Sequence, residues 1–352
     1  MKGVLNLATQ KEVAILADVS SITVSRVINN KGNIKEETRK RVLAAIEKLN
    51  YHPNSLARGL NQSRIFSIGV ASSIENPNVH FESHPYFNGL LEGIEQALME
   101  HSYDLVISTR RGKKKVSDYY RLYYEKKVDG IILICTSLRE DSVNEMLASD
   151  IPCVVIGDRT QNDKIPYVDS DNIQGGRDVT KKLIQYGHRK IAFVDGIERN
   201  YNVEERKKGF LEIMHENNLE VPSEYLFTAE LNNEEQSSSQ VMRSINLMKN
   251  PPTAVIAATD MIALGMMKEA LNIGIKIPDQ ISIVGFDGIN IGRYFTPSLF
   301  SVKQPLFAMG YTAAKQLMKI IEKRDVIVES HVFPVTLIPG ESIIPEIPIL
   351  DN

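Results

Sequence analysis

The first apolar residues of the chain recur with the 3.6-residue period of helices. Thr9 and Glu12 have the spacing of a capping box and predict a helix that runs to about Ala17. Ser20 can cap a second helix over about 21–28. One face of that second helix is apolar and the other is mostly polar. The apolar face carries Val24, Val27 and Ile28, and the other carries Ser21, Ile22, Ser25, Arg26 and Asn29.

A third helix is predicted over about 36–48, with an apolar stripe made of Val42, Leu43, Ile46 and Leu49. Two helices joined by a turn of about four residues suit DNA recognition when the second presents short polar side chains and one arginine. A small solvated bundle would show the same pattern, because helix-turn-helix patterns have many false positives.

Charge separates these two interpretations. Residues 1–63 carry 10 Lys and Arg against 5 Asp and Glu, whereas residues 64–352 carry 31 against 39. A basic small domain on an acidic larger one is expected where the small domain contacts nucleic-acid phosphates. The first domain is therefore predicted to bind DNA.

From Ile65 onward, short apolar runs alternate with helical stretches. The runs are rich in β-branched residues, as in parallel strands buried on both faces. The pattern runs twice, which indicates two doubly wound parallel-sheet subdomains with a cleft between them. The predicted strands are 65–70, 104–108, 130–134, 153–156, 190–194, 254–257 and 281–286, and the predicted helices are 87–101, 116–126, 174–186, 203–217, 235–248 and 261–271.

Composition narrows the class of protein further. The chain is 43% hydrophobic, enough for sizeable cores, but it has no run of 18 or more apolar residues that could span a membrane. Residues 1–9 lack the features of a secretion signal. Cys135 and Cys153 each lie in an apolar run and are expected to be buried free thiols in a reducing compartment. These features predict a cytoplasmic protein.

Motifs of catalysis are missing from the sequence. It contains no Walker loop, no G-x-S-x-G elbow, no H-E-x-x-H and no clustered Cys/His spacing. His188 stands alone at a turn and is expected to be structural. No enzymatic activity, metal or cofactor is therefore expected. A transport-type sugar-binding protein is a further alternative, which the basic first domain and the missing signal peptide disfavour.

Ligands of open α/β sheets bind at the carboxyl ends of the strands. Short acidic and hydroxyl side chains at such ends suit bidentate bonding to sugar hydroxyls. Each aspartate could instead cap a helix, above all Asp260, which precedes one. The pairs that this rule selects are Gly157-Asp158, Asp195-Gly196, Thr259-Asp260 and Asp287-Gly288.

The second helix offers the side chains that would read DNA. Arg26 could bond guanine or a phosphate, and an exposed Ile22 could meet a thymine methyl group. In a surface helix, Arg26 could instead form an ion pair and Ile22 could simply be exposed. The predicted DNA contacts in this domain are Thr9, Ser20, Ser21, Ile22, Thr23, Ser25, Arg26 and Asn29.

A short helix follows Pro53. It has only about eight residues, 54–61, and helices of that length are marginal in water. We expect this hinge segment to be frayed in the free protein and to fold on DNA. Leu56 and Leu60 could instead pack on each other or on the core.

Two runs resemble the lac repressor/galactose repressor family. Residues 19–29 (VSSITVSRVIN) resemble its recognition helix, and residues 49–60 (LNYHPNSLARGL) resemble its third-helix end and hinge. The resemblance implies that Leu60 wedges into a central base step from the minor groove. It adds the hinge residues Asn54, Ala57 and Leu60 to the predicted DNA contacts. Asp18 stands where the family usually has a turn glycine, so this turn is expected to be less relaxed.

The resemblance also implies an effector site in a core similar to periplasmic sugar-binding proteins. Arg206 and Asp287 match the family's effector-binding arginine and acid. Thr259 stands where many members have Asn, and Leu231 where others place an aromatic that stacks on the ligand. That loss favours a mono- or disaccharide, while a purine, a nucleoside and a phosphorylated co-regulator remain alternatives. With Asp158, which the strand-end rule selects, the predicted effector residues are Tyr86, Phe87, Asp158, Arg206, Leu231, Thr259 and Asp287.

The resemblance implies that the chain crosses between subdomains near Ile165, Ile291 and Asp325. The predicted organisation is a small all-α helix-turn-helix domain at 1–52, a hinge helix and linker at 53–63, and an α/β core at 64–352. The first subdomain would comprise 64–165 and 292–325, and the second 166–291 and 326–344. Some members of the family add a leucine-heptad tetramer helix at the tail, but this tail has two prolines and no leucine heptads, so a dimer on a palindromic operator is expected. The resemblance further implies a repressor, and the favoured effector implies a sugar-utilisation operon.

Overall fold

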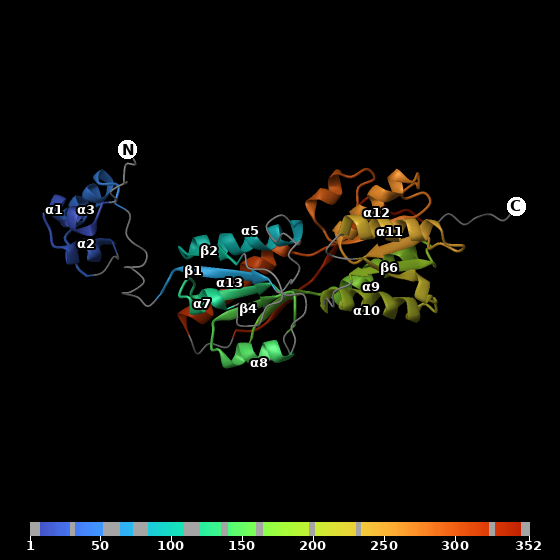
Figure 1. The fold of residues 1–352 in the computed structure, drawn as a ribbon, viewed down its shortest axis with the longest axis horizontal. Helices are drawn as coiled ribbons and strands as arrows, with labels where there is room; N and C mark the ends of the chain where they lie inside the picture. The colour runs from blue at the N-terminus through green and yellow to red at the C-terminus, as the bar shows by residue number, and fades with distance from the viewer. Residues whose placement is uncertain are drawn as a thin grey trace. The chain divides into compact units, whose positions relative to one another are not determined.

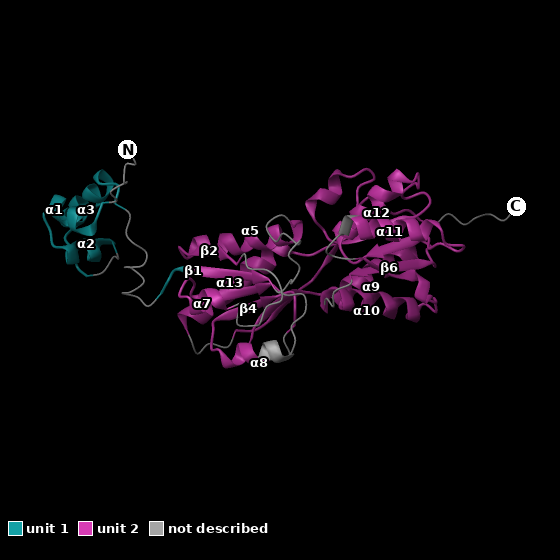
Figure 2. Cartoon of the chain, viewed as in Figure 1, with its two compact units in different colours: residues 1–66 teal, residues 67–352 magenta. Residues whose placement is uncertain are grey.

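The computed structural model describes most of the chain in ten stretches: residues 8–28, 32–51, 64–72, 84–108, 120–134, 140–159, 165–196, 201–229, 234–323 and 328–345. The chain divides into two compact units, residues 1–66 and residues 67–352 (Figure 2). The first unit is helical and the second is α/β, as the alternation of patterns predicts.

The first unit contains helices α1 (Gln10–Leu16), α2 (Ser21–Ile28) and α3 (Glu36–Lys48). The predicted boundaries are confirmed almost to the residue, because a capping box at Thr9 and a serine cap at Ser20 fix where α1 and α2 begin. The three helices enclose a small core that includes Val13, Val24, Val27 and Val42.

The prediction that Leu43 belongs to the buried stripe of α3 is wrong. Leu43 is 50% exposed, and Ala45 is buried with Val42 instead. Residues at i, i+3 and i+4 share a helix face, whereas i+1 is turned about 100° away. A unit of three short helices buries only a narrow stripe of each, which leaves Leu43 outside.

The second unit contains two six-stranded sheets with the same strand order. Sheet A has the order β11-β5-β4-β3-β1-β2 and sheet B the order β12-β10-β9-β8-β6-β7. The strand pairs are parallel except for β10 with β12. The strands of sheet A are β1 (Ser67–Ser72), β2 (Asp104–Ile107), β3 (Gly130–Ile134), β4 (Cys153–Ile156), β5 (Tyr167–Ser170) and β11 (His331–Phe333); those of sheet B are β6 (Ile191–Gly196), β7 (Leu226–Ala229), β8 (Ala254–Ala257), β9 (Ser282–Asp287), β10 (Phe300–Lys303) and β12 (Thr336–Ile338).

Helices cover both faces of each sheet, as in doubly wound folds. Figure 1 shows α5 and α8 on opposite sides of sheet A, and α9 with α10 opposite α11 with α12 around sheet B. The helices are α5 (Pro85–Glu100), α7 (Arg121–Tyr124), α8 (Glu140–Ala148), α9 (Asn172–Gln185), α10 (Tyr201–Glu216), α11 (Glu234–Asn246), α12 (Asp260–Asn272) and α13 (Leu306–Glu322), with short 3₁₀ helices η1 (Ser223–Tyr225) and η3 (Asn290–Tyr294).

The chain changes from one sheet to the other three times, each time later than expected. β5 still belongs to sheet A, but the next helix, α9, packs on α10 of the other half. In the same way β10 belongs to sheet B, and α13 after it packs on α5. The third change lies between β11 and β12. The crossings that the resemblance implies near Ile165, Ile291 and Asp325 therefore precede the observed ones, because β5, β10 and β11 still follow those positions in the sheet that the chain is about to leave.

Candidate DNA-reading and effector sites

The exposed face of α2 carries the side chains that the sequence selected for DNA. Ile22 is 66% exposed, and Arg26 is also exposed. Ser21, Thr23 and Ser25 are half-buried, while Val24 and Val27 on the opposite face are buried in the core of the unit. A single large apolar side chain beside an arginine on an otherwise polar face can contact a thymine methyl and a guanine edge together.

Two of the predicted DNA contacts also serve as helix caps. The Thr9 hydroxyl accepts from the Glu12 N–H, and the Glu12 carboxylate accepts from the Thr9 N–H at 2.6 Å. Ser20 Oγ accepts from the Thr23 N–H at 3.1 Å and lies 2.9 Å from the Thr23 hydroxyl. These hydroxyls fix the starts of α1 and α2 and thereby the presentation of the α2 face.

The turn between α1 and α2 contains Asp18 with a φ of +51°. That left-handed conformation is the one in which glycine carries no Cβ penalty. The expectation of a less relaxed turn therefore has a structural basis. Five predicted site residues lie outside the described part of the chain: Asn29, Asn54, Ala57, Leu60 and Leu231.

Arg206, on α10, is the centre of the candidate effector site. The residue is 4% exposed and its guanidinium carbon lies 3.8 Å from the centre of the Phe286 ring. Nε donates to Asn172 Oδ1 at 2.9 Å, and Nη1 donates to the Ala258 carbonyl at 2.6 Å. Nη1 also lies 3.5 Å from Asp287 Oδ1, a long ion pair. All of these bonds use Nε and Nη1, so within the described part of the chain Nη2 is the nitrogen that can donate to a ligand.

Asp287 ends β9 in a strained conformation, with a φ of +124°. Its carbonyl accepts from the Gln304 N–H at 3.1 Å, and its Oδ1 accepts from Gln304 Nε2 at 2.7 Å. The side-chain oxygen of Gln304 in turn accepts from the Ser170 hydroxyl at 2.6 Å. Gln304, on a segment that crosses between the sheets, therefore holds the Asp287 carboxylate that faces Arg206.

A second carboxylate, Asp169, lies on the other side of Asn172. Its Oδ1 accepts from the Ser170 N–H and from Asn172 Nδ2, and its Oδ2 accepts from Arg159 Nε at 3.1 Å. Burial raises the pKa of Asp169 to about 6, although the Ser170 N–H and the Arg159 charge oppose that rise. The site thus pairs each arginine with an aspartate and is rich in groups that bond hydroxyls.

Tyr86 brings the first half of the core to this site. Burial raises its pKa strongly, and the negative charge of Asp287 adds to the rise. Phe87 is buried and lies edge-on to Tyr86 at 5.5 Å, so it supports Tyr86 within α5. Tyr201, at the start of α10, is placed close enough to Arg159 and Asp169 for both charges to affect its pKa, which burial raises.

The other strand-end residues have different roles. Asp158 is buried at the end of β4. Thr259, rather than Asp260, is the N-cap of α12, since its hydroxyl accepts from the Ile262 N–H at 3.2 Å. The alternative that Asp260 caps this helix is therefore wrong. Asp260 instead accepts from the Ile289 N–H at 2.7 Å and from the Ser301 hydroxyl, which ties β9 to β10. Burial and the nearby charge of Asp287 raise its pKa to about 7.

Sequence reasoning missed four polar residues of this site: Asp169, Ser170, Asn172 and Gln304. All four are almost fully buried. They follow or end β5 and β10, the strands that apolar periodicity did not detect. A run of polar residues directly after a short strand was the available signal, and it would have needed those strands to be recognised first.

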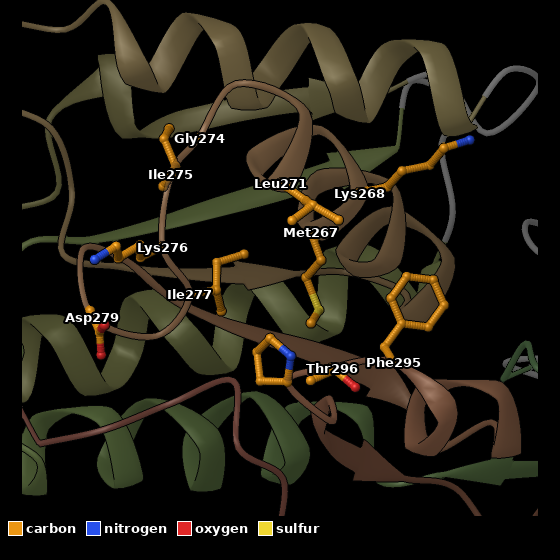
Figure 3. A pocket seen from close by; sticks show the side chains of 11 residues that line it. Met267, Lys268, Leu271, Gly274, Ile275, Lys276, Ile277, Asp279, Phe295 and Thr296 are labelled. Atoms are coloured by element: carbon orange, nitrogen blue, oxygen red, sulfur yellow. The ribbon is translucent and has the colours of Figure 1, made fainter.

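A surface pocket of about 470 Å³ lies elsewhere in the second unit (Figure 3). Met267, Leu271 and Phe295 line it with apolar surface, and Lys268 and Asp279 are among its charged lining residues. No predicted effector residue that the structure describes lines this pocket. Among the described residues, no helix is long and apolar enough to cross a membrane.

The surroundings of His188 and Cys153 indicate structural roles for both side chains. His188 Nδ1 lies 2.9 Å from the Thr253 hydroxyl and Nε2 lies 3.0 Å from the Ile344 carbonyl. Donation from Nε2 leaves Nδ1 to accept, which fits a neutral ring. Cys153 is buried and free, and burial raises its pKa to about 12. Cys135 lies outside the described residues.

Comparison with known proteins agrees with this architecture. Residues 9–54 match the bacterial regulatory proteins of the lacI family, and residues 180–343 match the periplasmic binding protein-like domain. Over 322 residues the chain is 32% identical to the HTH-type transcriptional repressor PurR of Photobacterium profundum, covering 91% of this chain and 93% of that protein. It is 33% identical over 319 residues to the probable HTH-type transcriptional repressor ExuR of Bacillus subtilis, covering 90% and 92%.

A solved structure of the transcriptional regulator CelR in complex with cellobiose has the same fold. It is 28% identical, with a TM-score of 0.69 over 95% of this chain and 99% of that one. Both the helical unit and the two-sheet core therefore have counterparts along nearly the whole sequence. The chain belongs to the lacI family of bacterial regulatory proteins, which are DNA-binding transcriptional repressors and not enzymes.

Proposed function

We propose that this protein is a dimeric repressor that binds a palindromic operator through α2 and the hinge segment, and that a mono- or disaccharide bound near Arg206 controls its affinity. The observation that carries the DNA part is the exposed α2 face, where Ile22 and Arg26 stand opposite a buried valine pair. The basic charge of residues 1–63 supports the same assignment.

Operator binding is tested by selecting a DNA site for the purified chain and measuring its dissociation constant at several salt concentrations. The affinity of the wild type should fall steeply as salt rises, because lysines and arginines release counterions from DNA. Ile22→Ala should cost about 1–3 kcal/mol on the selected site and little on unrelated DNA, as expected for a lost base contact. Binding that does not respond to salt or to Ile22→Ala would refute the assignment.

The sugar assignment is supported by the composition of the candidate site. Asp169 and Asp287 lie in it with Asn172 and Gln304, and such groups bond hydroxyls in pairs. Each arginine already has a carboxylate partner, which leaves little positive charge for a phosphorylated ligand. The CelR relative was solved with a disaccharide, cellobiose.

A panel of cellobiose, ribose, glucose 6-phosphate and hypoxanthine separates the effector classes. Calorimetry on the full chain gives binding, and operator affinity with each compound gives the sign of control. A sugar should bind and change the operator dissociation constant, and Arg206→Lys should weaken this effect because it loses the planar set of donors. A response to hypoxanthine alone would replace the sugar by a purine, in keeping with the PurR relatives.

The dimer is supported by apolar side chains exposed in one region of the second unit. Leu271 and Phe295 line the same pocket, and Tyr294, next to Phe295, is 85% exposed. Analytical ultracentrifugation should show a dimer for the wild type. Leu271→Glu should shift it toward monomer, whereas Leu247→Glu, an equally exposed leucine on the segment after α11, is the matched control. A Leu271→Glu protein that stays fully dimeric would place the interface elsewhere.

A further inference from the structure

The chain leaves sheet A after β5 and leaves sheet B after β10, and a hydrogen bond joins these two segments. β5 ends at Ser170 and leads into α9, and β10 ends at Lys303 and leads into α13. Ser170 Oγ donates to Gln304 Oε1 at 2.6 Å, and both residues are buried. This bond connects points 134 residues apart in the sequence.

The bond is one side of a closed ring of six residues, here called the crossing ring: Asp169, Ser170, Asn172, Arg206, Asp287 and Gln304. From Gln304 it runs through Asp287 at 2.7 Å to Arg206 at 3.5 Å. From Arg206 it continues to Asn172 at 2.9 Å, and from Asn172 to Asp169 at 3.2 Å. Asp169 closes the ring by accepting from the Ser170 N–H at 2.8 Å.

Two amide side chains make this closure possible. Gln304 accepts from a hydroxyl and donates to the Asp287 carboxylate, while Asn172 accepts from a guanidinium and donates to the Asp169 carboxylate. Only a group with both a donor and an acceptor can stand between such neighbours. Their orientation follows from these partners, because an amide oxygen cannot donate to a carboxylate.

We propose that Gln304 and Asn172 are positioning residues of the effector site, which link the Arg206–Asp287 pair to both crossing segments. A ligand that draws Arg206 or Asp287 toward itself has to strain or break these links. Because these segments join the two halves of the core, strain on the links would change the equilibrium between arrangements of the halves when a ligand binds. The inference rests on the proposed effector site.

A merely structural role for Gln304 would lower stability and nothing else, so the test compares two buried glutamines. Gln304→Leu removes both ring bonds with little change of volume. Gln316→Leu is the matched control, because Gln316 is also buried and donates to a backbone carbonyl, that of Glu329, outside the ring. Asn172→Leu breaks the ring at its other amide and should reproduce Gln304→Leu.

Amide hydrogen exchange of the full chain without any added compound gives the first readout. Gln304→Leu and Asn172→Leu should speed exchange in residues 169–172 and 303–306 by about tenfold or more, the loss expected when a bond to a charged group disappears. Gln316→Leu should leave both segments as in the wild type. Equal exchange in Gln304→Leu and Gln316→Leu would overturn the inference.

Operator affinity with and without cellobiose, ribose, glucose 6-phosphate or hypoxanthine gives the second readout. For a compound that acts on the wild type, the ratio of the two dissociation constants, typically about 5- to 150-fold, should fall toward one in Gln304→Leu and stay unchanged in Gln316→Leu. An unchanged ratio in Gln304→Leu would overturn the inference while leaving the effector assignment intact. If no compound acts on the wild type, the proposed effector class fails, and the exchange experiment still decides whether the ring holds the segments.

Discussion

Replacing Gly176 with alanine should displace Arg206 without changing any residue expected to contact an effector. Gly176 lies on α9 where this helix packs against α10. A Cβ atom at this position would press on the carbonyl oxygen of Arg206 and lie 3.0 Å from its carbonyl carbon, tighter than ordinary van der Waals contact. Backbone is in the way, so no side-chain rotation relieves the overlap.

The size of the displacement follows from these contacts. Restoring a contact of 3.4 Å requires the two helices to separate by about 1 Å. Arg206 Nε now lies 2.9 Å from Asn172 Oδ1, and Asn172 stands one turn before Gly176 on α9. The same separation lengthens that bond to nearly 4 Å, beyond the range of about 2.7–3.2 Å in which N–H donors bond oxygen. The overpacked interface should also cost about 1–3 kcal/mol of folding stability.

The assay is the Nε–Hε signal of Arg206 in ¹⁵N-labelled protein, followed by its exchange with solvent. In the wild type the bond to Asn172 should protect this proton, and Gly176→Ala should abolish the protection. The melting temperature should fall by about 2–4 °C for each kcal/mol lost.

Gly310→Ala is the control from the other half of the core. A Cβ at Gly310, on α13, would press on the Leu90 carbonyl of α5 in the same way. It should lower the melting temperature similarly and leave the Arg206 signal protected. Full protection in Gly176→Ala, or equal loss in Gly310→Ala, would refute the claim that this helix contact positions Arg206.

Three further substitutions test other parts of the molecule. Asp18→Gly should stabilise the first unit by about 1 kcal/mol by relieving a φ of +51°, seen as slower amide exchange in α1 and α2; faster exchange would contradict this. Thr9→Ala should destabilise α1 by about 1 kcal/mol through loss of its capping box, Thr9→Ser should restore most of this, and an unchanged exchange rate would count against the cap. The folded state holds the Asp260 proton more tightly than the unfolded state, with a pKa of about 7 against 3.8, so the free energy of unfolding should fall as pH rises from about 4 to 7. Asp260→Asn should flatten the matching decline in melting temperature, and an equal slope in both proteins would exclude Asp260 as its source.

The strands that the sequence predicts well are those buried on both faces. β3, β4 and β8 are uninterrupted apolar runs, and their observed bounds equal the predicted ones. β5 and β10 are short and mix apolar with polar residues. Asp169 and Ser170 at the end of β5 belong to the crossing ring, whereas Ser301 in β10 bonds Asp260 and the ring residue Gln304 follows the strand. In β5 the same polar residues that build the site therefore hide the strand from a search based on hydrophobicity.

The residues of the candidate site likewise differ in whether the sequence alone predicts them. Asp158 and Asp287 follow recognisable strands, so the strand-end rule selected them. Arg206 lies on a helix, where no local rule marks it, and only the resemblance to the family drew attention to it. Gln304 and Asn172 needed the three-dimensional crossing itself, since each bonds a residue that lies more than 15 positions away.

The two halves of the core share one packing arrangement of helices, which has a different role in each half. In each half a helix that arrives from the other sheet packs closely on the helix after the first strand, α9 on α10 and α13 on α5. The glycine of the arriving helix meets the carbonyl of Arg206 in one half and of Leu90 in the other. Leu90 is a buried core residue, whereas Arg206 reaches the crossing ring. One backbone arrangement thus serves core packing in the first half and polar recognition in the second, and it places Arg206 beside the segments on which the chain crosses between the sheets.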